Sequence, residues 1–318
     1  MTLTRLFATL AVAALMITGC GSADTEVDEE TATTGAFPAT VVTESGDVVI
    51  DVEPERIVTL GNPAFENVTA LGFTPVAAAL SNAEGLPYLS EYATSEAIDD
   101  ELADAYSGTI NFEKIATYRP DLIVAPSWPA FTDPSVLSNL REIAPTLVFD
   151  TQDAQTDWRV GVDQVATGLG KSEKGRELVD EAVAAFAASG EAYPTLSERP
   201  YSFGLYMSDR IALGSGGNIL RLLGMTPAED QVTVEASGTS ITYAGETIPD
   251  VDGDVVILMP FPQEAASALE QSPFWANGLD ARVVWLSDAQ GEAINNAGIL
   301  GKTWLAQNFE QTLGQIDG

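Results

Sequence analysis

The sequence predicts an α/β fold in which two lobes of similar size are joined by one long α-helix. Short apolar strands alternate with helical segments on both sides of the chain's middle, a pattern typical of mainly parallel sheets. Between the two sets lies Ser172–Ser189, about five helical turns with one apolar stripe. We expect an N-terminal lobe over residues 37–170, a bridging helix over 171–190 and a C-terminal lobe over 191–318.

The first lobe opens with apolar and polar residues that alternate around Ser45-Gly46-Asp47, which predicts a β-hairpin. Breakers such as Gly72 and Pro120 mark the ends of its helices. The predicted elements are a hairpin over Ala39–Val52; strands over Arg56–Leu60, Pro75–Leu80, Asp121–Ala125 and Thr146–Phe149; and helices over Ala64–Leu71, Ile110–Tyr118, Ser135–Ile143 and Trp158–Gly168.

The second lobe repeats the alternation. Pro260-Phe261-Pro262 follows the apolar strand predicted over Asp254–Met259, and its two prolines predict a loop at the end of that strand. The predicted elements are strands over Tyr201–Tyr206, Ile211–Leu213, Asp254–Met259 and Arg282–Leu286, and helices over Gly217–Leu223 and Asn296–Leu313.

The N-terminus has the features of an export signal. Leu6–Ile17 is an uncharged run of 12 residues after Arg5, which is too short to span a bilayer. The tetrapeptide that ends in Cys20 resembles the bacterial lipobox, although its first residue is Ile17 where Leu is usual. We expect a signal peptide over residues 1–19, lipidation of Cys20 and an acidic, Thr-rich flexible tether over 20–36. The alternative is an ordinary secreted protein with an incidental cysteine.

Composition excludes several kinds of chemistry. The chain has no histidine and one cysteine, which rules out Ser/His/Asp and Cys/His nucleophiles and His-ligated metals. Its 47 acidic residues against 14 basic ones, a net charge of −33, argue against nucleic acid as a partner. The run Gly298–Thr303 is similar to a phosphate-binding loop, but Asn296 stands where such a loop needs glycine. We expect no catalytic residue, no cofactor and no metal bound by the protein itself.

Five segments, in this order, resemble the bacterial solute-binding lipoproteins that deliver ferric siderophores, haem or cobalamin to ABC importers. The resemblance implies two Rossmann-like lobes with a ligand cleft between them, a monomer, and an ABC permease dimer with its ATPase as partner on the extracytoplasmic face of the membrane. The segments read PERIVTLGNPAFENVTALGFTPVA, NFEKIATYRPDLIVAPS, GSGGNILRLLGM, DVDGDVVILMPF and SPFWANGLDARVVWL.

Ligands of open parallel sheets bind beyond the carboxyl ends of the strands, so the loops after the strands carry the expected binding residues. Trp128 and Phe261 are the stronger aromatic candidates, because each follows a strand end next to a proline. Trp158, Trp275 and Trp304 are assigned to packing. The expected ligand-binding set is Asn62, Pro63, Phe65, Ser81, Asn82, Asn111, Ser127, Trp128, Tyr206, Arg210, Ser240, Tyr243 and Phe261.

The scarcity of basic residues near the expected cleft limits the class of ligand. Arg210 is the only basic residue expected near the cleft, which favours a neutral hydroxamate-type ferric siderophore; cobalamin and Tyr-ligated haem are the alternatives. The resemblance also implies that one glutamate of each lobe docks into the permease: Glu66 matches in the first lobe and Glu229 in the second, where Asp230 and Glu235 compete. A carboxylate-dependent extracytoplasmic enzyme on a bilobal scaffold, or an anchored adhesin or signalling subunit, stays open as another class.

Overall fold

The computed structural model describes residues 36–104, 107–151, 157–207, 209–262, 264–275, 279 and 282–317. Ala36–Gly318 forms one compact unit, distinct from Met1–Gly35. The predicted signal peptide, Cys20 and nearly all of the tether therefore lie outside the described residues. Within the described ranges, no helix combines the length and apolar character that crossing a membrane requires.

The first lobe is built on a four-stranded parallel sheet of order β4-β3-β7-β8. Its strands are apolar and buried, as expected for a sheet covered on both faces. Because all four run the same way, their carboxyl ends meet at one edge. Its elements are β1 (Ala39–Val41), β2 (Val48–Ile50), β3 (Ile57–Leu60), α1 (Asn62–Ala70), β4 (Ala77–Ala79), η1 (Ala83–Gly85), β5 (Ala103–Asp104), β6 (Thr109–Ile110), α2 (Phe112–Thr117), β7 (Leu122–Pro126), α3 (Pro129–Thr132), α4 (Pro134–Ile143), β8 (Thr146–Phe149) and α5 (Trp158–Gly168).

The second lobe contains a five-stranded mixed sheet of order β11-β10-β9-β12-β13. β9, β12 and β13 are parallel, whereas β10 and β11 return antiparallel. Its elements are η2 (Pro194–Glu198), β9 (Tyr201–Met207), β10 (Arg210–Leu213), η3 (Ser215–Leu223), α7 (Glu229–Ser237), β11 (Thr242–Ala244), η4 (Gly245–Asp250), β12 (Val255–Pro260), α8 (Ala265–Glu270), β13 (Val283–Trp285), α9 (Asp288–Asn295), α10 (Ile299–Gln307) and α11 (Glu310–Asp317).

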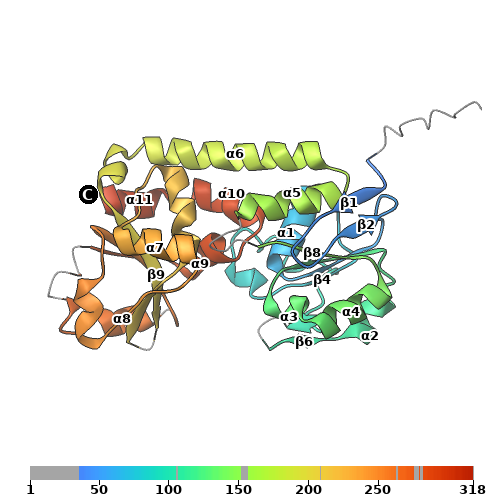
Figure 1. Ribbon diagram of the computed structural model, residues 1–318, viewed down its shortest axis with the longest axis horizontal. Helices are drawn as coiled ribbons and strands as arrows, with labels where there is room; N and C mark the ends of the chain where they lie inside the picture. The colour runs from blue at the N-terminus through green and yellow to red at the C-terminus, as the bar shows by residue number, and fades with distance from the viewer. Residues whose placement is uncertain are drawn as a thin grey trace, which may run out of the picture. The chain divides into compact units, whose positions relative to one another are not determined.

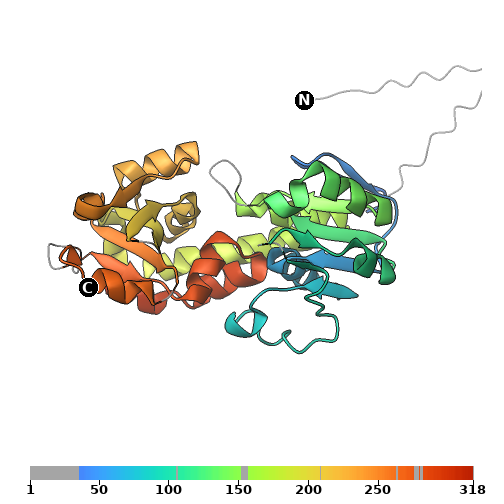
Figure 2. The ribbon, with the colours of Figure 1, turned by 90° about the horizontal axis from the view of Figure 1, so that it is seen from below.

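One long helix, α6 (Ser172–Glu191), runs along both lobes (Figure 1). Two of its glycines permit close contact with the lobes: a methyl group on Gly175 would overlap Ala166 of α5, and one on Gly190 would overlap the backbone of Leu223. Figure 2 shows the two lobes from below, with α6 behind them. The predicted fold class, two α/β lobes joined by one helix, is confirmed.

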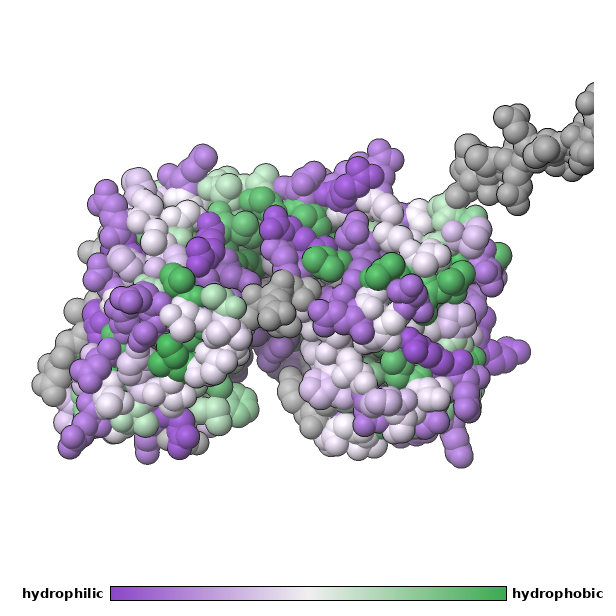
Figure 3. All heavy atoms as spheres, in the orientation of Figure 1, coloured by the Kyte–Doolittle hydropathy of each residue, from purple (hydrophilic) through white to green (hydrophobic). Residues whose placement is uncertain are grey.

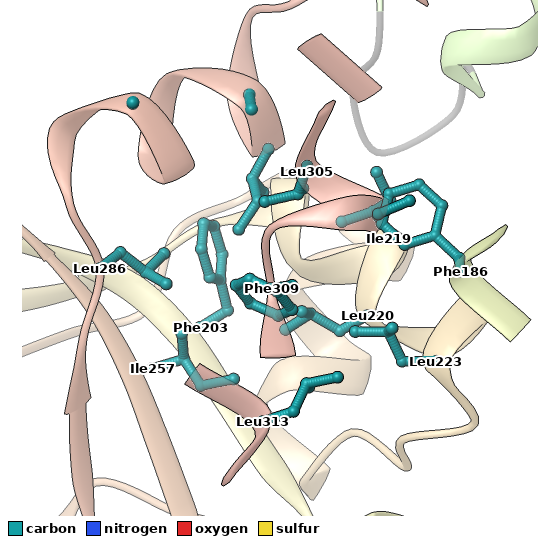
Figure 4. Packing of buried hydrophobic residues seen from close by; sticks show 14 of the residues in the cluster. Phe186, Phe203, Ile219, Leu220, Leu223, Ile257, Leu286, Leu305, Phe309 and Leu313 are labelled. Carbon is teal, nitrogen blue, oxygen red and sulfur yellow. The ribbon is translucent and has the colours of Figure 1, made fainter. Parts of the chain in front are cut away.

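A hydrophobic core extends from one lobe into the other. Phe186 of α6 and Phe203 of β9 pack with Leu305 of α10 and with Phe309, which lies between α10 and α11 (Figure 4). Phe65 of the first lobe belongs to the same cluster. On the side away from α6 the surface is hollowed between the lobes (Figure 3).

Three predicted helices differ from the structure. Ile110 belongs to β6, so the predicted Ile110–Tyr118 helix is shorter, and the helix after Gly214 is a 3-10 helix. The predicted Asn296–Leu313 helix is two helices, because α10 ends at Gln307 and α11 begins at Glu310.

Candidate ligand-binding site

Three cavities lie at the carboxyl edge of the first sheet, and Trp128 lines all of them. Their volumes are about 860, 180 and 260 Å³. Trp128 lies two residues after the end of β7, at the N-cap of α3, and its ring stacks on Phe131 of α3 with ring centroids 6.4 Å apart. A side chain on Gly61, the residue after β3, would come within 3.2 Å of the indole. The indole therefore lies across the ends of β3 and β7.

Polar side chains at this edge tie neighbouring strand ends together. Asn62 Nδ2 donates to the Ser81 carbonyl, and the Ser81 amide donates to Asn62 Oδ1, both at 2.9 Å. The Thr151 amide donates to Ser127 Oγ at 2.9 Å, and the two hydroxyl oxygens lie 3.0 Å apart. These bonds brace β3 against β4 and β7 against β8, which holds the rim of the site in place.

The largest of the three cavities is lined mainly by hydroxyl groups and prolines, together with one acidic and one basic side chain. Arg141 of α4 donates to the Ser45 carbonyl in the β1–β2 turn at 3.1 Å. Glu44 of the same turn also faces this cavity. The set that lines it is Glu44, Ser45, Ser127, Trp128, Pro129, Thr132, Pro134, Leu137, Ser138, Arg141 and Thr151.

The second cavity is shared by both lobes. Residues from α1, β8 and α5 form one side, and residues 295–298, the last residue of α9 and the α9–α10 loop, form the other. Asp150 also faces it, but its carboxylate accepts bonds from the Glu44 amide at 3.1 Å and from Gln164 Nε2 at 2.6 Å. The carboxylate of Asp150 is thus engaged in fixing the end of β8.

Strand register brings several predicted residues of the second lobe to one edge. Tyr206 lies opposite Pro260 and opposite Ile211, and Ile211 lies opposite Tyr243. Arg210 and Phe261 lie at this edge and are exposed, Phe261 by 60%. The side chains of Tyr206 and Tyr243 are instead buried, and their hydroxyls donate to Asp209 and Asp230.

Ser240 was expected at the cleft and is not there. β11 runs antiparallel to β10, with Ala244 opposite Arg210 and Thr242 opposite Ala212. Ser240 precedes Thr242 and therefore lies toward the opposite edge of the sheet. The expectation treated it as part of a loop after a strand, whereas it comes before one.

Three residues predicted to bind ligand in the first lobe have structural roles. Phe65 is 3% exposed and packs edge-on against Tyr92, with ring centroids 5.2 Å apart. Both polar groups of the Asn62 side chain are bonded to Ser81. Asn111 Oδ1 caps α2 by accepting from the Lys114 amide at 3.0 Å. Of the other candidates, Pro63, Ser81, Ser127 and Trp128 line the cavities, and Asn82 is exposed at the start of η1.

The assignment of Glu66 to permease docking is wrong. Its side chain is fully buried between α1 and α10, and Oε2 accepts from the Gly301 amide at 2.8 Å. Burial raises the pKa of this carboxyl to about 8. Glu229, by contrast, is exposed in the first turn of α7.

Sequence reasoning missed several lining residues that do not directly follow a strand. Arg141 comes from the last turn of α4, and Asp100 and Asp104 come from the segment before β6. Residues 296–298 of the α9–α10 loop were predicted as the start of the Asn296–Leu313 helix. Among the described residues no three acidic or sulfur side chains gather as metal ligands.

Comparison with known proteins agrees with this architecture. The chain is 26% identical over 294 residues to the probable siderophore-binding lipoprotein YfiY of Bacillus subtilis, covering 86% of this chain and 83% of that one. A periplasmic solute binding protein from Mycobacterium smegmatis has a TM-score of 0.70 at 22% identity, covering 88% and 99% of the chains. Streptococcus pneumoniae PiaA in complex with ferrichrome has a TM-score of 0.68 at 20% identity, covering 88% and 98%. The family model described as periplasmic binding protein matches residues 57–281, and the chain belongs to that family.

Proposed function

We propose that this protein captures a ferric siderophore outside the cytoplasm and delivers it to an ABC permease dimer with its ATPase. The observation that carries the proposal is the group of cavities that share the Trp128 indole at the carboxyl edge of the first sheet. The names of YfiY, a probable siderophore-binding lipoprotein, and of PiaA, solved with ferrichrome, support it. A lipid anchor on Cys20 would keep the receptor near its permease and raise their effective concentration.

The charges that line the cavities favour a chelate without net negative charge. Glu44, Asp100, Asp104 and Asp150 supply four carboxylates, whereas Arg141 supplies one guanidinium group. This excess repels an anionic catecholate complex. The indole and the hydroxyl groups suit a neutral hydroxamate. Iron in such a complex is already fully ligated, so no cofactor or metal ligand from the protein is needed.

We propose further that Glu229 docks into the permease. Its side chain is exposed at the start of α7, whose first amides are held by Asp252, so the carboxylate is placed on a fixed surface turn. Reversing its charge with Glu229→Arg should abolish uptake in cells while binding of ferrichrome by the purified protein is retained. Uptake that persists would remove Glu229 from the docking surface.

Titration of tryptophan fluorescence tests the ligand class. Ferrichrome and ferrioxamine should quench reversibly, whereas a ferric catecholate should bind at least about tenfold more weakly. Trp128→Phe should lose most of the quenching, and Trp304→Phe, which removes a ring packed 5.5 Å from Tyr88, should keep it. Binding of cobalamin or haem alone would shift the assignment within the family. Conversion of a ligand to product would favour an enzyme.

A further inference from the structure

The first turn of α10 is capped by side chains from the other lobe. Gly298, at the N-cap, provides no side-chain cap. Asn67 Oδ1 accepts from the Ile299 amide at 2.9 Å, and Glu66 Oε2 accepts from the Gly301 amide at 2.8 Å. The first amides of a helix have no acceptor within it. Here α1 supplies the acceptors across 232 residues of chain.

A buried lysine joins the same contact. Lys302 is 1% exposed, and its Nζ donates to the carbonyls of Ala293 and Ile294 at the end of α9, at 2.9 and 2.7 Å. We call Glu66, Asn67, Gly298, Ile299, Gly301 and Lys302 the lobe joint. Three helices, α1, α9 and α10, therefore meet through buried polar groups.

The lobe joint adjoins the cavity that both lobes share. Residues 295–298 line this cavity together with Pro63 and Asn67 of α1. A Cβ on Gly298 would lie 2.7 Å from Asn67 Oδ1 and 2.8 Å from the Pro63 carbonyl, so the loop rests directly on α1. Any displacement of the start of α10 would move the cavity wall.

We propose that Glu66 is a positioning residue for the ligand site: its carboxyl group holds the start of α10 on α1 and thereby fixes the wall formed by residues 295–298. The inference rests on the proposed function, since it assumes that ligand occupies this cavity. The side chain touches no ligand itself and acts through the backbone of α10.

The charged groups around the lobe joint make its strength depend on pH. Burial, with a smaller contribution from Glu292 of α9, raises the pKa of Glu66 to about 8 against the opposing effects of the Gly301 and Gly298 amides and of Lys302. Burial lowers the pKa of Lys302 to about 7, against the attraction of Glu66 and of Asp157 at the start of α5. As pH rises from 4.5 toward about 8, the closed lobe joint loses stability relative to an open state that exposes the carboxyl, because burial favours the protonated form and water favours the ionised form.

Amide hydrogen exchange of the whole protein tests this without a ligand. The probes are the amides of Ile299 and Gly301 in the lobe joint, and of Asn296 and Ala297 in the cavity wall, with Glu66→Gln compared with wild type. At about pH 4 the two proteins should show equal protection, because glutamine mimics the protonated carboxyl and the stabilising contribution of Glu66 is complete. At about pH 8 wild type should have lost at least about tenfold in protection relative to Glu66→Gln. The affinity for ferrichrome, measured by titration of both proteins at the same two pH values, should show the same difference.

Two further variants complete the test. Glu66→Ala removes the acceptor and should lower protection at both pH values, and Glu173→Gln, an exposed first-turn glutamate of α6, should match wild type throughout. Equal protection of wild type and Glu66→Gln at every pH, or loss at Ile299 without loss at Asn296, would overturn the proposal. If exchange behaves as expected but wild type does not bind ferrichrome, the positioning of the wall stands and the proposed ligand class fails.

Discussion

Replacing Gly298 by alanine measures how closely the two lobes are joined. Its backbone angles, φ −77° and ψ −161°, are open to any residue, so the substitution adds no conformational strain. The new methyl group would instead meet α1, at 2.7 Å from Asn67 Oδ1, 2.8 Å from the Pro63 carbonyl and 2.9 Å from Glu66 Cβ. Two of these atoms cannot rotate away, so α10 must shift.

The shift has two costs. Overpacking in a tight interior destabilises by about 1–3 kcal/mol. Moving α10 outward also lengthens the bond from the Ile299 amide to Asn67, and leaving a buried donor unsatisfied costs about 1–3 kcal/mol. The terms overlap, because partial relaxation of one relieves the other. We expect Gly298→Ala to lower the free energy of unfolding by about 2–5 kcal/mol.

Urea unfolding followed by circular dichroism provides the assay. The matched control is Gly214→Ala, which alters another extended N-cap glycine of the second lobe, where the nearest atom to a new Cβ is 3.9 Å away. The control should stay within about 0.5 kcal/mol of wild type. If Gly298→Ala loses no more stability than the control, the close approach of α10 to α1 is incorrect.

Other substitutions test the site and its supports. Trp128→Ala should weaken ferrichrome binding by about tenfold or more by calorimetry, since one indole lines all three cavities; unchanged affinity would place the ligand elsewhere. Asn62→Ala removes two hydrogen bonds to Ser81, each contributing about 0.5–1.5 kcal/mol, and should cost about 1–3 kcal/mol in urea unfolding; an unchanged stability would show that these bonds do not brace β3 against β4. The stabilising contribution linked to the raised pKa of Glu66 is complete below 4.5 and is lost as pH rises to about 8. The contribution linked to the lowered pKa of Lys302 returns as pH rises from about 7 to 10.5. The stability of wild type minus that of Glu66→Gln/Lys302→Met should therefore pass through a minimum near pH 7–8, and a flat difference would refute both shifts.

Most strands could be predicted from local sequence, because a strand buried on both faces is an apolar run between breakers. The predicted Thr146–Phe149 coincides with β8, and Arg56–Leu60 contains β3. The predicted helix Asn296–Leu313 failed because its apolar pattern continues through the break between α10 and α11. There Asn308 Nδ2 donates to the Trp304 carbonyl at 2.9 Å, and Phe309 is wholly buried in the core. Tertiary packing decides that break.

The candidate site was predictable only to the level of loops. The rule that ligands lie beyond the carboxyl ends of strands located the region of Ser127 and Trp128. It could not distinguish a side chain that faces the cavity from one that faces the core, so Phe65 and Asn62 were assigned with the others. The rule also could not identify Arg141, because this residue lines the cavity from a helix and not from a loop after a strand.

Glu66 shows why the remaining errors arose. Its position in α1 matched a family pattern, but its exposure is decided by α10, at the other end of the chain. The glycines and lysine of Gly298–Lys302 were similar to a phosphate-binding loop for a physical reason. In a phosphate-binding loop and at the start of α10 alike, a helix N-terminus with small side chains lies against an oxygen-bearing group, and a lysine lies nearby. In a phosphate loop that group is a ligand, whereas here it is a carboxyl group of the same chain. The pattern therefore indicated the right local geometry, and only the fold could supply the partner.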